Sequence, residues 1–360
     1  MIHDQLLLNV YKVLGLGGVS FFLGIALEPI LSHYLYKYKM WRKDVRTTAP
    51  DGAPTPIFNQ LHKVRETKAP RMGGVLIWGT TLIVAILFWA LSIIFNDELF
   101  LKLNFLSRSQ TWVPLGILCA GALVGLLDDF FVVFQKGSYK GGGLTFTRRV
   151  GLILIIAFLG AYWFYAKLDF SYRELLIPGV SNPIYLGWLL IPFYVGVMLA
   201  TFSSGVIDGI DGLAGGVFAS IFGAYSGIAF FQGQIDIAAF CAVITGSILA
   251  FLWFNIPPAR FYMTETGVMA LTTTLTTVAF LTHAVAVLPI IAFPLVIESL
   301  SVIIQLSSKR FFGKKVFLVA PIHHHFEAIG WPPEKVTMRF WIISIIFAIF
   351  GMILHLVSFS

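Results

Sequence analysis

Long apolar stretches constrain the fold of this chain more than any other feature of its 360 residues. One of them reads WLLIPFYVGVMLATF, and it runs into a glycine-rich motif with two aspartates, GVIDGIDGLAGG. A bilayer core about 30 Å thick is crossed by roughly 20 such residues in a helix. The sequence therefore predicts an all-α integral membrane protein with about ten transmembrane helices. The predicted spans are about 11–36, 72–95, 111–134, 149–166, 186–207, 213–231, 236–256, 267–283, 285–306 and 338–357, with a weak break near His283.

Composition supports a membrane environment. Only 12% of the residues are charged and 58% are hydrophobic, whereas a soluble domain carries about 25% charged residues. Cys119 and Cys241 both lie in apolar stretches, so they form neither a disulfide framework nor a zinc spacing. The start, MIHDQLLLNV, has no basic segment and no small-residue cleavage site, so we expect no cleaved signal peptide. We find no internal repeat and expect one polytopic membrane domain over residues 1–360.

The basic residues fix the predicted orientation. An even number of spans puts both termini on one side of the membrane. With both termini outside (periplasmic or extracellular), the inner segments and their immediate span edges hold 20 of the 25 Lys and Arg residues. Short inner loops are enriched in these residues, so topology explains the net charge of +7, and we do not expect nucleic-acid binding. The inner segments are 37–71, 135–148, 208–212, 257–266 and 307–337.

Four polar motifs, far apart in the sequence, reach this same inner face. They are GLLDDF at the end of the third span, GVIDGIDGLAGG after the fifth, FLWFNIPPARFYMTETG after the seventh and APIHHHFEAIG in the last inner loop. We therefore expect one site on the cytosolic face, formed by the five inner loops. Its candidate residues are Asp128, Asp129, Asp208, Asp211, Asn255, Glu265, His323, His324, His325 and Glu327.

Each motif also has a structural interpretation. Asp128 and Asp129 could form a solvated helix end, but adjacent like charges at membrane depth favour a nearby cation or basic loop. The glycines around Asp208 could serve only a turn, or could let a polar ligand approach the backbone. Zinc binding by the three histidines is disfavoured because no accompanying ligand spacing is present. Glu265 could be a helix cap. Glu28 and Glu298 lie within apolar stretches, where a functional role and an interhelical hydrogen bond are equally plausible.

The combination of residue types indicates chemistry on phosphate groups. Mg²⁺ binds carboxylate oxygens and often bridges to substrate phosphates. Phosphoryl transfer depends on positioning and charge neutralisation more than on covalent machinery. The apolar body of the chain suits a lipid acceptor.

At these residues the sequence resembles the polyprenyl-phosphate N-acetylhexosamine-1-phosphate transferases, within the glycosyltransferase 4 family. The family has ten spans with both ends outside. The matching motifs occur in the family's order along the chain. They are APRMGG (69–74), LLDDF (126–130), DGIDGLAGG (208–216), FLWFNIPPA (251–259), ESLSVIIQ (298–305), APIHHHFE (320–327) and MRFWIIS (338–344).

The histidine motif and RFWIIS resemble one branch of this family. That resemblance implies an enzyme that converts UDP-MurNAc-pentapeptide and undecaprenyl phosphate into lipid I and UMP, with Mg²⁺. It implies a multi-pass protein of the bacterial cytoplasmic membrane and a step of peptidoglycan synthesis, on which cell shape, cell division and the cell cycle depend. A homodimer is common in the family.

The resemblance also implies roles for particular residues. Asp128 and Asp129 would serve the lipid phosphate, one of them as base or nucleophile. Asp208 would belong to the catalytic and metal site together with Glu265, and Asp211 to the nucleotide site. Asn255 would contact uridine. The remaining implied substrate-binding residues are His323, His324 and His325, for the diphosphate or sugar, and Lys68.

Some positions depart from the family pattern. The family's MGDxGS is MTETGV here, so Glu265 stands in place of a metal-binding Asp and Val268 follows the glycine. Gly205 replaces an Asn, and an earlier Asn aligns with Phe202. Glu66 replaces a Lys, which leaves Lys68 or Lys63 as its substitute.

Three other functions remain open. A sister transferase would use another UDP-amino sugar, although the HHHFE motif argues against it. A catalytically weak membrane scaffold is motivated by Gly205 and Glu265. A transporter is disfavoured because the acids gather at one face and do not line a path at the membrane midplane.

Overall fold

The computed structural model describes residues 2–43, 69–106, 109–136 and 143–359, and nearly all of their regular structure is helical. Lys68 and Lys63 lie outside these residues. The long helices are α1 (Ile2–Lys37), α3 (Val75–Ile94), α5 (Ser109–Val133), α6 (Phe146–Lys167), α7 (Leu190–Ser203), α8 (Leu213–Phe231), α9 (Ile235–Asn255), α10 (Thr264–Leu281), α12 (Phe293–Phe312) and α14 (Pro333–Phe359). The short elements are α4 (Glu98–Leu103), η1 (Phe170–Arg173), η2 (Gly187–Leu189), η3 (Ser204–Ile207), α11 (Leu288–Ile291), α13 (Ile322–Ala328) and an antiparallel hairpin of β1 (Glu174–Leu175) and β2 (Ile184–Tyr185).

Eight helices among the described residues are long and apolar enough to cross a membrane. The prediction of an all-α membrane protein is therefore confirmed. Of the other two predicted spans, 267–283 overlaps α10, whereas 285–306 covers α11 and only the first part of α12. The weak break near His283 is confirmed: α10 ends at Leu281, His283 has a positive φ of 53°, and α12 begins only at Phe293.

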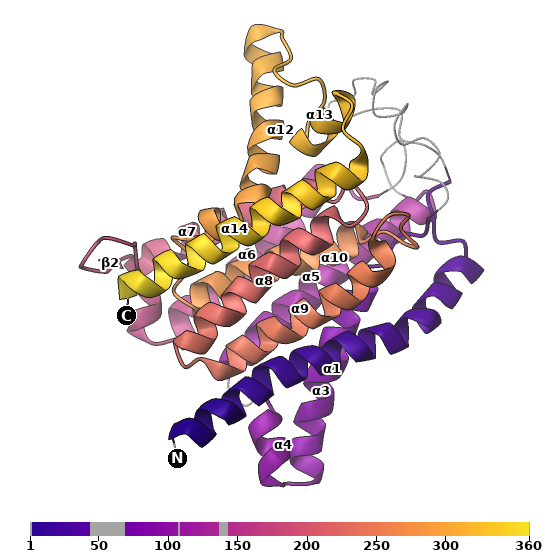
Figure 1. The fold of residues 1–360 in the computed structure, drawn as a ribbon. Helices are drawn as coiled ribbons and strands as arrows, with labels where there is room; N and C mark the ends of the chain where they lie inside the picture. The colour runs from indigo at the N-terminus through magenta and orange to yellow at the C-terminus, as the bar shows by residue number, and fades with distance from the viewer. Residues whose placement is uncertain (1, 44–68, 107–108, 137–142, 360) are drawn as a thin grey trace.

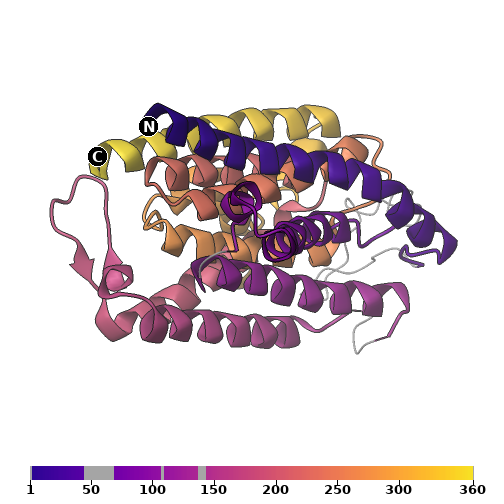
Figure 2. The same ribbon diagram turned by 90° about the horizontal axis from the view of Figure 1, so that it is seen from below.

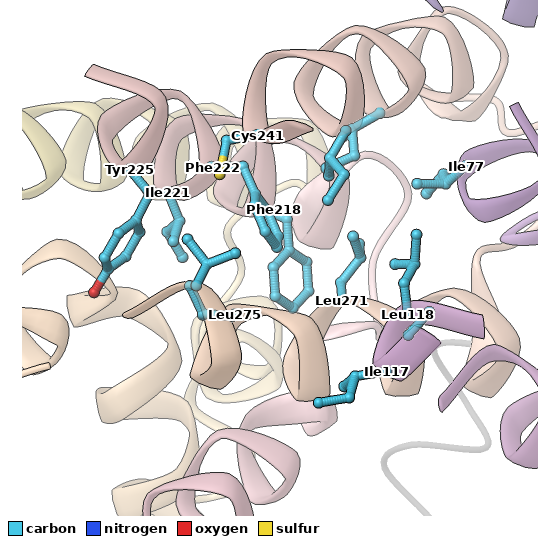
Figure 3. Close-up of a cluster of buried hydrophobic side chains, with 14 of the residues drawn as sticks. Ile77, Ile117, Leu118, Phe218, Ile221, Phe222, Tyr225, Cys241, Leu271 and Leu275 are labelled. Carbon is cyan, nitrogen blue, oxygen red and sulfur yellow. The ribbon is translucent and has the colours of Figure 1, made fainter. Parts of the chain in front are cut away.

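The helix α10 lies inside the protein and does not face lipid. Every residue from Thr266 to Leu281 is buried. Its threonine hydroxyls donate to carbonyls one turn earlier, as Thr273 Oγ1 does to Met269 O at 2.7 Å, so they are satisfied without water. Figure 3 shows Leu271 and Leu275 of α10 in one buried cluster with side chains of α3, α5, α8 and α9.

The helices α5 and α10 cross in close contact because Gly125 has no side chain. A Cβ at Gly125 would lie 2.1 Å from the carbonyl oxygen of Glu265. Small residues allow helix backbones to approach in this way. The crossing places the last turns of α5, with Asp128 and Asp129, beside the first turn of α10.

Both chain termini and the β hairpin lie at one end of the bundle, as Figures 1 and 2 show. The opposite end holds the C-terminal ends of α1 and α5 and has α13 beside it (Figure 1). We call this opposite end the site end. The helix α12 projects out of the bundle next to α13 (Figure 1).

Candidate active site

The predicted acidic residues meet around the N-terminus of α10. Asp128 and Asp129 come from α5, Asp208 follows η3, and Glu265 lies in the first turn of α10. The hydrogen bonds and ion pairs described next join these four residues into one group, which we call the carboxylate cluster. The expected convergence of these motifs on one end of the molecule is therefore confirmed for these residues.

Asp129 is completely buried and accepts four hydrogen bonds. Its Oδ1 accepts from Arg71 Nη2 at 2.8 Å and Nε at 3.2 Å. Its Oδ2 accepts from Thr264 Oγ1 at 2.5 Å and from the backbone N–H of Thr266 at 3.0 Å. A buried carboxylate held in this way ties the segment of Arg71 to the start of α10.

The APRMGG segment places Arg71 for this contact. The backbone N–H of Tyr262 donates to Pro70 O at 2.9 Å, and that of Gly73 donates to Tyr262 O at 2.8 Å. The segment is therefore fastened to the chain just before α10. The two family-like motifs, APRMGG and MTETGV, are neighbours in space.

Asp128 has fewer partners. Its Oδ1 accepts from the backbone N–H of Leu144 at 2.7 Å and lies 3.9 Å from Arg149 Nε. Arg149 also donates from Nη1 to Glu265 Oε1 at 2.6 Å. Arg149 thus links Asp128 to Glu265, and with Arg71 it supplies the cations that the adjacent aspartates were expected to need.

Thr264 connects two of the carboxylates. Its backbone N–H donates to Asp208 Oδ2 at 2.7 Å, while its hydroxyl donates to Asp129. The hydroxyl also accepts from Met72 N at 3.1 Å. Thr264 has a φ of 56°, which is unfavourable for a β-branched residue. These three hydrogen bonds therefore hold a strained backbone in place.

Asp208 lies between two spans, and burial raises its pKa to about 6, against the opposing effect of the Thr264 hydrogen bond. Desolvation of this kind disfavours a bare carboxylate. A proton or a cation at Asp208 would offset this desolvation cost.

Asp211 and Asn255 connect loops. Asp211 is buried, and its Oδ2 accepts from Ala259 N at 3.2 Å. The Asn255 side chain accepts from Gly212 N at 2.9 Å and donates to Phe261 O at 2.8 Å. Both ends of the Asn255 amide are thus engaged with the backbone. In this conformation Asn255 holds residues 208–212, which we call the aspartate loop, against residues 259–261. Its predicted contact with uridine stays a prediction.

Two histidines of α13 point at the aspartate loop. His323 Nδ1 lies 2.9 Å from Glu298 Oε2, and His324 Nδ1 lies 2.6 Å from Glu327 Oε2. A Cβ added to Gly209 would lie 2.3 Å from His323 Nε2 and 2.8 Å from His324 Nε2. A side chain at position 209, next to Asp208, would therefore require the two imidazole rings to move. His325 is partly exposed, and its Nδ1 accepts from Leu318 N at 3.3 Å.

The two glutamates within apolar stretches both have polar partners. Glu298 is the partner of His323, and its buried Oε1 has no hydrogen-bond partner among the residues that the structure describes. Glu28 is 1% exposed and accepts from Arg260 Nη1 at 3.0 Å. Glu28 therefore forms an ion pair between α1 and the loop after α9, so its partner lies in a loop and not on a second helix.

Three residues that contact the carboxylate cluster were not singled out from the sequence. They are Arg71, Arg149 and Thr264. The two arginines were counted only as inner-loop charges, although the need for a cation beside Asp128 and Asp129 pointed to them. Thr264 gave no signal by itself, because its role depends on the fold around α10.

The chemistry of the carboxylate cluster suits a hard cation, but the protein alone does not complete a metal site. Within the described ranges, no three His, Cys, Asp or Glu side chains are grouped so that they could hold a metal ion. Mg²⁺ usually keeps several waters and binds through one or two carboxylates plus substrate phosphates. A Mg²⁺ ion at these carboxylates would therefore need substrate and water to complete its coordination.

Comparison with known proteins gives consistent matches. The model of glycosyl transferase family 4 matches residues 111–284, which include all four acids of the carboxylate cluster but not Arg71. A phospho-N-acetylmuramoyl-pentapeptide-transferase of Geobacillus sp. (strain WCH70) is 36% identical over 337 residues, 92% of this chain and 94% of the relative. The protein of the same name from Anoxybacillus flavithermus (strain DSM 21510 / WK1) is 34% identical over 96% of this chain and 98% of its own length. The one from Pelagibacter ubique (strain HTCC1062) is 34% identical over 98% and 96%.

Proposed function

Since the chain belongs to the phospho-N-acetylmuramoyl-pentapeptide-transferase family, we propose that its site end transfers phospho-MurNAc-pentapeptide from UDP-MurNAc-pentapeptide to undecaprenyl phosphate. The chain is a membrane-bound transferase of this type, which passes phospho-MurNAc-pentapeptide to a lipid carrier in peptidoglycan synthesis. The products of the proposed reaction are UMP and lipid I.

The carboxylate cluster with its two arginines is the observation that carries the proposal. The contacts above join four acids and two guanidinium groups, and the histidines of α13 face the aspartate loop that carries Asp208. Guanidinium groups bind phosphate oxygens, and carboxylates bind the cation that accompanies them. This pairing favours a diphosphate substrate over a neutral one.

The two adjacent aspartates take different roles in this proposal. Asp129 is fully committed to Arg71, Thr264 and Thr266, so it positions the cluster. Asp128 accepts one backbone hydrogen bond and lies 3.9 Å from Arg149, so it is the better placed of the two to receive a proton from the lipid phosphate or to attack a phosphorus atom. Proton transfer to a positioned side chain contributes about 10²- to 10⁴-fold to a rate.

Asp208 and Glu265 are the residues that we assign to hold Mg²⁺. When bound, the ion would neutralise charge on the substrate diphosphate. His323 and His324 lie against Gly209, the residue next to Asp208, and would contact the diphosphate or the sugar. Asp211, Asn255 and Lys68 complete the proposed substrate site.

The proposed orientation has ten membrane-crossing segments with both termini outside, so that the site end is cytosolic. The distribution of Lys and Arg along the sequence supports it. The membrane is then the bacterial cytoplasmic membrane. A homodimer stays a prediction.

Release of UMP by the purified full-length chain tests the proposal. Undecaprenyl phosphate and UDP-MurNAc-pentapeptide are supplied with and without Mg²⁺, and UDP-GlcNAc is run in parallel. Mg²⁺-dependent release only with the MurNAc substrate is the expected result. Release only with UDP-GlcNAc would assign the chain to a sister reaction, and no release from folded protein would favour the scaffold alternative.

A further inference from the structure

The loop between α12 and α13, with the end of α12, combines positive charge with exposed aromatic rings. We name residues 308–318 the basic-aromatic segment. Phe311 and Phe312 are 73% and 76% exposed. The sequence contains no acidic residue from 299 to 326. Four cations lie within seven residues of the segment: Lys309, Arg310, Lys314 and Lys315.

We propose that the basic-aromatic segment binds anionic phospholipids of the leaflet at the site end of the bundle. The partner is the lipid surface itself, recognised through phosphate-bearing headgroups and the acyl chains beneath them. This inference concerns a surface outside the carboxylate cluster, and it holds whatever reaction that cluster performs.

The polarity of α12 places this segment at a membrane surface. The polar residues Glu298, Ser301 and Gln305 are buried on the inner face of the helix, whereas Ile303 and Leu306 are exposed. A helix with its polar residues inside and apolar residues outside faces lipid and not water. Figure 1 shows α12 projecting from the bundle, which agrees with the exposure of this apolar face among the described residues. The cations follow directly where this apolar face ends.

The segment is held in a defined conformation. Gly313, with a φ of 66°, ends α12. The Gln305 side chain accepts from the backbone N–H groups of Val316 and Phe317, each at 3.0 Å, and donates to Phe317 O at 2.9 Å. Ser308 Oγ donates to Lys314 O at 2.9 Å. The loop is therefore ordered before it meets a ligand, which lowers the entropic cost of binding.

Charge and shape together favour a lipid over a soluble anion. Each Lys or Arg close to an anionic membrane surface strengthens binding about fivefold. Exposed Phe rings beside such cations insert into the boundary between headgroups and acyl chains. A soluble phosphate would use the cations but would leave Phe311 and Phe312 in water.

The thermal unfolding midpoint of the full-length chain in neutral detergent is the readout that we would use. Phosphatidylglycerol is titrated against phosphatidylcholine with the same acyl chains and against glycerol phosphate. We expect phosphatidylglycerol to raise the midpoint at the lowest concentration and glycerol phosphate to leave it unchanged. Replacing Lys314→Gln and Lys315→Gln together should raise the half-saturating concentration of phosphatidylglycerol about 25-fold, with the response to phosphatidylcholine unchanged.

A matched pair at the other end of the bundle is the control. Lys102→Gln with Lys167→Gln removes the same charge far from the segment and should leave the phosphatidylglycerol response as in the original chain. Phe311→Ser with Phe312→Ser should weaken the response to both lipids. The proposal is overturned if the original chain does not prefer phosphatidylglycerol, if the control pair loses the preference equally, or if glycerol phosphate reproduces the shift.

Discussion

At the scale of single residues, the two adjacent aspartates of α5 should respond differently to substitution. We expect Asp128→Asn to lower UMP release at least about 10²-fold, because a proton acceptor is removed, and to leave the unfolding midpoint nearly unchanged. Assays of activity and thermal unfolding on the same preparation check both. Wild-type activity in this variant would remove Asp128 from the reaction.

Asp129→Asn should act on stability as well. Its amide would have to place an NH₂ group against either Arg71 or the N–H of Thr266, so one buried donor loses its acceptor. Removing one partner of a buried ion pair costs about 3–5 kcal/mol. Thermal unfolding should therefore show a large fall in midpoint for Asp129→Asn and not for Asp128→Asn, and equal midpoints would contradict the roles assigned here.

Thr264 offers a test of the strained connection between Asp129 and Asp208. Thr264→Val keeps the shape but removes the hydroxyl, which leaves Met72 N–H and Asp129 each with one partner fewer. A loss of about 1–3 kcal/mol in stability is expected, together with lower activity. Thr264→Ser retains the hydroxyl and should restore both. If Val and Ser behave alike, the hydroxyl does not position the carboxylates.

Two departures from the family pattern lie against each other in the structure. A Cβ at Gly205 would lie 2.5 Å from Cγ1 of Val268. The missing side chain at 205 therefore makes room for the branched side chain at 268, and the two departures compensate each other sterically. Gly205→Ala should lower stability by about 1–3 kcal/mol through overpacking. Val268→Ala in the same chain should restore it. Unfolding free energies of both single variants and the double variant measure this coupling, and purely additive effects would contradict it.

At the scale of elements, the crossing of α5 and α10 should control activity. Gly125→Ala places a Cβ against the Glu265 carbonyl, so the helices must separate and Asp128 must move relative to Glu265. A displacement of about 1 Å can lower a rate about 10²-fold. Gly116→Ala on the same helix is the matched control, since nothing lies within 4 Å of its added Cβ. Equal activities of the two variants, measured as UMP release, would show that the crossing distance does not matter.

At the scale of the whole molecule, the proposed orientation predicts which surfaces reach which compartment. A cysteine at Asn182, in the exposed hairpin loop, should react in intact cells with a maleimide that cannot cross membranes. A cysteine at Glu334, at the site end, should react only after the membrane is opened. The chain with only Cys119 and Cys241 gives the background. Labelling in the reverse order would place both termini in the cytosol.

The sequence by itself determined the class of fold, the position of the break near His283 and the convergence of the acidic motifs. These follow from local or additive properties: the length of apolar stretches, the preference of Lys and Arg for one side, and the spacing of carboxylates along the chain. The expectation that Asp128 and Asp129 need a nearby cation was also met, by Arg71 and Arg149.

Only the tertiary structure decided which residues act together. Asp128 and Asp129 have different hydrogen-bond partners because of where α5 crosses α10, at Gly125. Thr264 has its role only because its backbone, with a positive φ, lies between Asp129 of α5 and Asp208. Hydrogen bonds between residues more than 100 positions apart, such as those from Thr264 and Thr266 to Asp129, depend on helix packing, and no local pattern in the sequence encodes that geometry.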